Sequence, residues 1–73
     1  MYKKFELEKT IYSIIKINND GTALEVSNFM DMPKIETWAE ITDVFSDYVD
    51  ATEQEFLKFY VYILGLFNEK TFN

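Results

Sequence analysis

Apolar and polar residues alternate through the first part of the chain, and this period of two is typical of a β-strand with one buried face. Residues 10–17 are rich in β-branched and aromatic side chains, and Leu24 and Val26 alternate with small or polar neighbours over residues 22–27. Between these segments, Asn18-Asn19-Asp20-Gly21 is a strong turn signal because glycine adopts positive φ at no steric cost. The sequence therefore predicts an antiparallel β-hairpin.

The residues on either side of this hairpin give weaker signals. Phe5 and Leu7 alternate with charged side chains, so either the first hairpin strand begins near Lys3 or a separate short strand precedes it. Residues 28–33 end in Pro33 and are predicted to be a connection. The predicted β-structure thus has two or three strands.

After this connection, the apolar residues follow the spacing of an α-helix. The helix is predicted to begin between Pro33 and Trp38, because proline is tolerated in a first turn whereas Thr37-x-x-Glu40 is a capping box that would start the helix later. Residues 50–52 are predicted to end it. The residues on its predicted buried side are Trp38, Ile41, Phe45, Tyr48 and Val49.

A second helix is predicted from the capping box Thr52-x-x-Glu55 to about Asn68. Residues 56–67 are apolar nearly all round, so this helix is either central in the fold or shared with another subunit. Its β-branched and aromatic content leaves a strand as the alternative. Together the elements predict a small α+β fold in the order ββαα, with residues 1–73 forming a single domain.

Acidic side chains recur at alternating intervals of four and three residues through the first predicted helix. On an α-helix this spacing places them in one narrow stripe opposite the apolar side, without any basic residue among them. If the helix starts at the later capping box, the first acid drops out of the stripe. The residues are Glu36, Glu40, Asp43, Asp47 and Asp50.

Composition sharpens the meaning of this stripe. The net charge is −6, and all of it comes from residues 35–73, because residues 1–34 carry five acids and five lysines. Such an acidic balance disfavours direct binding to DNA or RNA and favours a partner with a basic surface. The longest apolar stretch is too short to span a bilayer and no signal peptide is visible, so we expect a cytoplasmic protein without a membrane anchor.

The residue types needed for most catalytic chemistry are missing. The chain contains no histidine, cysteine or arginine, which removes the imidazole base, the thiolate nucleophile and the usual zinc ligands. Neither an EF-hand loop nor a phosphate-binding loop is present. We therefore expect no catalytic residues, no metal and no cofactor.

Two functions from different classes remain. In the first, the acidic stripe resembles the charge spacing of a nucleic-acid strand, so that the protein occupies the basic nucleic-acid site of another protein, as anti-restriction and anti-CRISPR proteins of phages and plasmids do. In the second, the protein is a non-catalytic assembly module that dimerises through its aromatic second helix, and the stripe is only a solvated face. Trp38, Tyr60 and Tyr62 are either core residues or interface anchors.

Overall fold

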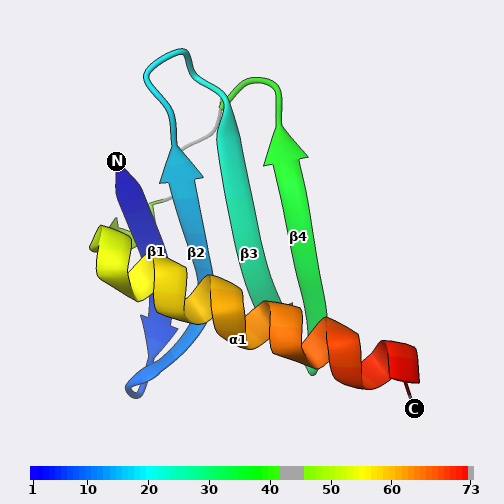
Figure 1. The fold of residues 1–73 in the computed structure, drawn as a ribbon. Coiled ribbons are helices and arrows are strands. Elements are labelled where there is room, and N and C mark those ends of the chain that lie inside the picture. Colours follow the sequence, from blue (N-terminus) through cyan, green and yellow to red (C-terminus); the bar gives the residue numbers. More distant parts are fainter. Residues whose placement is uncertain (42–45, 73) are drawn as a thin grey trace.

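The structure, a computed structural model, describes residues 1–41 and 46–72. Its strands form one antiparallel sheet in the order β4-β3-β2-β1-β5, and the single helix of the described residues lies across one face of that sheet (Figure 1). This confirms the α+β class. The elements are β1 (Tyr2–Leu7), β2 (Thr10–Ile17), β3 (Ala23–Phe29), β4 (Met32–Trp38), β5 (Val49–Asp50) and α1 (Glu53–Phe72).

Two tight turns and one longer turn connect the first four strands. Glu8 and Lys9, between β1 and β2, both have positive φ (49° and 68°), as do Met30 and Asp31 between β3 and β4 (54° and 59°). Two consecutive residues of positive φ define the type I′ turn, whose twist matches that of the strands it joins. The predicted hairpin of β2 and β3 is confirmed, with Gly21 at a φ of 89° in its turn.

The prediction for the region around this hairpin is right at one end and wrong at the other. On the N-terminal side, β1 is a separate strand that precedes the hairpin, as in the second of the two predicted alternatives. At the other end, residues 28–33 are not a loop, because β3 continues to Phe29 and β4 begins at Met32. Neither type I′ turn contains the glycine that usually marks such a turn. The sequence therefore does not predict the turn between β3 and β4.

The first of the two predicted helices is wrong over the described residues. Met32–Trp38 is strand β4, paired with β3 along its whole length, while Val49–Asp50 is strand β5 on the opposite edge of the sheet. Ile35 lies opposite Val26 in this pairing and packs against the core. Backbone pairing and this burial outweigh the helical spacing of the apolar residues. Phe45, which the sequence predicts on the buried side of that helix, lies outside the described residues.

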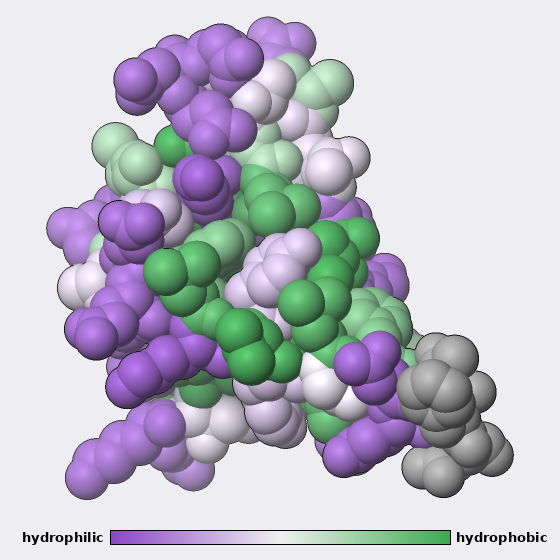
Figure 2. Space-filling model, viewed as in Figure 1, coloured by the Kyte–Doolittle hydropathy of each residue, from purple (hydrophilic) through white to green (hydrophobic). Residues whose placement is uncertain are grey.

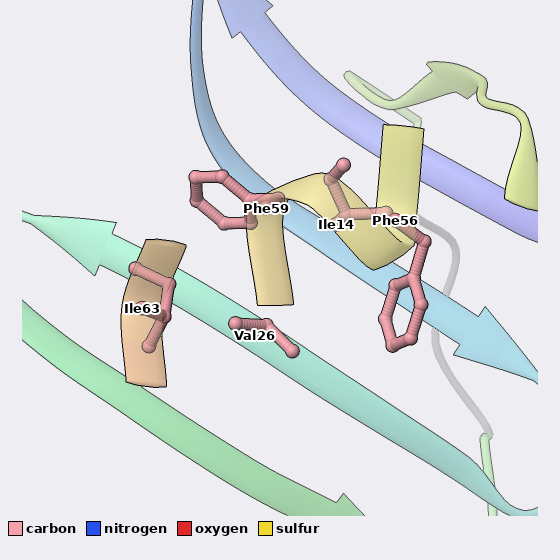
Figure 3. Packing of buried hydrophobic residues seen from close by; sticks show 5 residues of the cluster. All are labelled: Ile14, Val26, Phe56, Phe59 and Ile63. Carbon is pink, nitrogen blue, oxygen red and sulfur yellow. The ribbon is translucent and has the colours of Figure 1, made fainter. Parts of the chain in front are cut away.

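The main core lies between the sheet and α1. Ile14 of β2 and Val26 of β3 are direct neighbours in the sheet and point toward the helix, which contributes Phe56, Phe59 and Ile63 (Figure 3). The helical residues are spaced by three and four, so they project from one side of α1. The predicted second helix is thus confirmed, and it is central to the fold.

The other face of the sheet is also covered. Ser13 and Ile15, which point away from α1, are fully buried. Strands β4 and β5 lie at opposite edges of the sheet, and in the connection between them the Tyr48 hydroxyl donates a hydrogen bond of 2.9 Å to Ser13 Oγ. Tyr48 also packs against Phe5, with their ring centroids 5.7 Å apart. A sheet of only five strands therefore buries side chains on both faces.

Candidate functional site

The start of α1 is fixed by reciprocal hydrogen bonds. The Glu55 amide donates to Thr52 Oγ1 at 3.0 Å, and the Thr52 amide donates to Glu55 Oε1 at 2.9 Å, which is the predicted capping box. The second oxygen of Glu55 accepts a hydrogen bond of 2.5 Å from Lys4 Nζ of β1. This bond to Lys4 holds the pKa of the Glu55 carboxyl below its usual value and raises the pKa of Lys4. The first turn of α1 is thereby attached to β1.

The outer side of α1 carries a line of exposed apolar side chains, which we call the outer ridge: Leu57, Val61 and Leu64. Their exposed fractions are 53%, 67% and 40%. The intervals of four and three residues place them in one row, on the side opposite to the core residues. Figure 2 shows apolar atoms gathered over the face on which α1 lies, with polar residues around them. A helix with apolar residues on both sides agrees with the nearly uniform apolarity of residues 56–67.

The acidic residues predicted to bind a partner do not form a helical stripe in the structure. Glu36 lies on β4 and its carboxylate is 3.6 Å from Lys34 Nζ. Asp50 lies on β5 and accepts a hydrogen bond of 2.6 Å from Lys3 Nζ, which lowers the pKa of its carboxyl. These two acids therefore have lysine partners, contrary to the prediction of a line of charge without any base.

The register of the sheet places Glu36 and Asp50 in one cross-strand row instead of on one helix. Both lie on the face away from α1, at the two ends of a row that crosses all five strands, which places them about 19 Å apart at about 4.8 Å per strand. Of the other predicted acids, Glu40 and Asp47 are exposed, and Asp43 lies outside the described residues. The row, from edge to edge, consists of Glu36, Glu25, Ile15, Lys3 and Asp50.

The three candidate interface aromatics lie in different environments. Trp38, at the end of β4, is 38% exposed, and its indole nitrogen donates a hydrogen bond of 3.3 Å to Glu25 Oε1. Tyr60 is half-buried against Phe56, with ring centroids 5.9 Å apart. Tyr62 of α1 is 54% exposed. Trp38 and Tyr62 are therefore accessible to a partner, whereas Tyr60 belongs largely to the core.

A polar network that sequence reasoning missed joins the two sides of the sheet face away from α1. Besides Trp38, Glu25 accepts hydrogen bonds from Ser13 Oγ at 2.8 Å and from the Tyr48 hydroxyl at 3.2 Å. Burial raises the pKa of Tyr48. Ser13 is fully buried, so its hydroxyl has no access to a substrate. The network holds Tyr48 on the sheet, and only the strand register, which no local motif encodes, brings its members together.

An open groove of about 740 Å³ lies beside α1, along the flank of the helix that carries Lys58 and Tyr62. The type I′ turn residues Lys9 and Asp31 line it from the sheet, and Lys58 and Tyr62 line it from the helix. Asn28 of β3 also lines it. The volume is in the range of small-molecule sites. No sequence motif marked this groove, because it forms only where α1 passes the two turns.

The described residues contain neither a metal-binding cluster nor a membrane-spanning helix. Over residues 1–41 and 46–72, no three carboxylate, histidine or cysteine side chains are grouped so that they could hold a metal ion. In the same part of the chain, no helix has both the length and the apolarity to cross a bilayer. No family model, curated protein or solved structure matches the chain.

Proposed function

We propose that the protein is a non-catalytic assembly module that forms a homodimer through the outer ridge of α1. The single observation that carries this proposal is the row of Leu57, Val61 and Leu64, which is exposed on the outside of a helix whose other side fills the core. Exposed apolar residues are ordinary one at a time, but a continuous row on one helix is typical of a helix that packs against another.

The polarity around the ridge favours a second copy as the occupant. Gln54 and Asn68, which extend the same row at its two ends, are uncharged. Two copies of this chain, each with a net charge of −6, repel each other over most of their surfaces. A ridge without acidic side chains is therefore the part of α1 where like chains approach at the least electrostatic cost.

Small and large residues on the ridge side are also self-complementary. When two α1 helices cross antiparallel about Val61, Leu57 of each copy faces Gly65 of the other, because the two residues lie four positions on either side of Val61. The space over Gly65 is open: apart from its chain neighbours and the adjoining helix backbone, no atom lies within 4 Å of the position a Cβ would take. Leucine over glycine is a close-packed arrangement for paired helices. We therefore propose the antiparallel dimer.

The experiment is sedimentation equilibrium at micromolar concentration with the wild type and Val61→Glu. The wild type should sediment at twice 8.7 kDa, and Val61→Glu should sediment as a monomer because it buries a charge in the dimer. Asn19→Glu, with the same charge change in the exposed β2–β3 turn, is the matched control and should remain dimeric. A monomeric wild type, or dimeric Val61→Glu, would remove the proposal.

The acidic residues support a second candidate function, in which the protein occupies the basic nucleic-acid site of another protein. The specific observation is that Glu40 and Asp47 are exposed and have no ion pair with any described residue, while Glu36 stands directly opposite Glu25 in the sheet. Like charges facing each other across strands are destabilising. A basic partner that covers this surface would neutralise Glu40 and Asp47 and relieve the repulsion between Glu36 and Glu25.

This second candidate is tested by recovering partners from a lysate with the wild type and with Glu40→Lys/Asp47→Lys. Binding should be lost in the double variant and should be displaced by added DNA, since both compete for one basic groove. Glu8→Lys/Glu69→Lys, which reverses two exposed charges elsewhere, is the matched control and should bind as the wild type does. A partner that binds the double variant equally well, or that holds DNA at the same time, rules this function out.

A further inference from the structure

The groove beside α1 has an apolar floor. Ile11 packs against the core from the sheet side, and Phe59 is buried beneath the helix, so the floor is held in place by the fold itself. Tyr62, which lines the groove from α1, is 54% exposed. An apolar floor with a few polar groups around it is the usual character of a small-molecule site.

One residue that lines the groove, Asn28, has a buried polar atom without a partner. Asn28 Oδ1 is buried and accepts no hydrogen bond from any described residue. Asn28 borders both the main cavity and a smaller adjoining cavity of about 150 Å³. Buried carbonyl oxygens are nearly always paired in folded proteins. A bound group with an N–H would supply the missing donor.

The charges around the groove are unevenly satisfied. Two carboxylates line the groove: Glu55 is paired with Lys4, and Asp31 is likewise not free. In contrast, Lys9 on the β1–β2 turn and Lys58 on α1 form no ion pair with any described residue, and both line the groove. Unpaired lysines are the complement of a carboxylate. They are notable in a chain whose net charge is −6.

We propose that this groove binds a small amphiphilic carboxylate that carries an apolar body and an amide N–H, the chemistry of an N-acyl amino acid. The apolar body packs on Ile11 and Phe59, and the carboxylate is held by Lys9 and Lys58. The amide N–H donates to Asn28 Oδ1. The proposal is independent of the dimer, because Leu57, Val61 and Leu64 do not line the groove.

The experiment is a titration of ¹⁵N-labelled protein with N-acetylphenylalanine, following the amide shifts of Asn28, Lys58 and Tyr62. Two matched probes each lack one feature: N-acetylphenylalaninamide has no carboxylate, and 3-phenylpropanoate has no N–H. Each should bind about tenfold more weakly, as is typical for the loss of one charge-assisted or buried hydrogen bond. A peptide that ends in phenylalanine serves as a further probe.

Three variants locate the binding. Lys58→Gln should weaken binding of N-acetylphenylalanine by about tenfold, and Lys16→Gln should leave it unchanged, because Lys16 is exposed and does not line the groove. Asn28→Val should remove the advantage of N-acetylphenylalanine over 3-phenylpropanoate. The proposal is overturned if the three probes bind alike, if the two lysine variants behave alike, if the shifts map to the outer ridge, or if only the peptide binds.

Discussion

Lys4 and Glu55 join the second layer of the fold to the first: the ammonium group of a β1 residue donates to the carboxylate of an α1 residue at 2.5 Å, across 51 positions of sequence. The Lys4 side chain is 15% exposed and that of Glu55 is 33% exposed. The same carboxylate caps the helix through the Thr52 amide. One side chain therefore both begins α1 and attaches its first turn to the sheet.

The first prediction concerns this pair and pH. Glu55→Gln keeps the capping box, because glutamine also serves at this position, but it removes the ion pair. At neutral pH it should lower the free energy of unfolding by about 1 kcal/mol, discounted for partial exposure. Since the bond to Lys4 lowers the pKa of Glu55, its contribution is present above the unfolded value of about 4.3 and lost as pH falls through the lower folded value.

Urea unfolding from neutral pH down to about pH 3 measures this contribution. The difference between wild type and Glu55→Gln should shrink across the acid range. Glu53→Gln, with the same charge change in the same turn, is the control and should show a smaller difference. At alkaline pH the pH dependence runs in the opposite direction. Because the pKa of Lys4 is raised, the stabilisation from the ion pair is lost as pH rises above about 10.4. A pH-independent difference would contradict the assignment.

The second prediction uses Gly65 to separate monomer stability from dimerisation. Apart from its chain neighbours and the adjoining helix backbone, no atom lies within 4 Å of the position a Cβ would take, so Gly65→Ala should stabilise the monomer by about 0.5–1 kcal/mol through helix propensity. In the antiparallel dimer the added methyl group would meet Leu57 of the second copy and weaken association. The melting temperature of dilute protein should therefore rise, while the association constant from sedimentation at higher concentration should fall. Tighter association of Gly65→Ala would exclude the antiparallel arrangement.

The third prediction tests the core beneath α1. Ile63 is fully buried against the sheet, so Ile63→Ala should cost about 2–5 kcal/mol in the free energy of unfolding. Asn68→Ala, at an exposed position of the same helix, should change it by less than about 0.5 kcal/mol. Denaturant titration of both variants provides the comparison. Similar losses for the two would mean that α1 is not packed as described.

The fourth prediction concerns the network around Glu25. Tyr48→Phe removes the hydroxyl that donates to Ser13 and should cost about 0.5–1.5 kcal/mol. Burial raises the pKa of Tyr48, so the folded protein keeps this hydroxyl protonated at a pH where the unfolded chain ionises it. The free energy of unfolding therefore falls as pH rises above about 10. The tyrosinate absorbance of the wild type minus that of Tyr48→Phe should therefore appear above about pH 10. A transition at the ordinary value would show that this hydroxyl is solvated.

The parts of the fold that could be predicted from the sequence are those with local causes. Gly21 permits the positive φ of the β2–β3 turn, and alternation predicts that Leu24 and Val26 share one side of β3. Thr52 and Glu55 are three positions apart, so their capping box forms within one helical turn. Such signals depend only on neighbouring residues, and each of them matches the structure.

Tertiary structure decided what the local pattern left ambiguous. Residues 32–38 carry both a helical spacing and the short alternation of Lys34, Ile35, Glu36 and Thr37, and pairing with β3 selected the strand. The predicted acidic stripe depended on that helix, so Glu36 and Asp50 instead lie at opposite ends of the sheet, each beside a lysine.

The groove and the contacts between layers are likewise beyond the reach of the sequence alone. Lys4 meets Glu55, and Asn28 meets the groove beside Lys58, only because α1 crosses the sheet at one particular position. That position is set by how Phe56, Phe59 and Ile63 fit against Ile14 and Val26. Spacing along the chain determines which face of an element is apolar, whereas the packing of two such faces determines which polar groups at their margins come into contact.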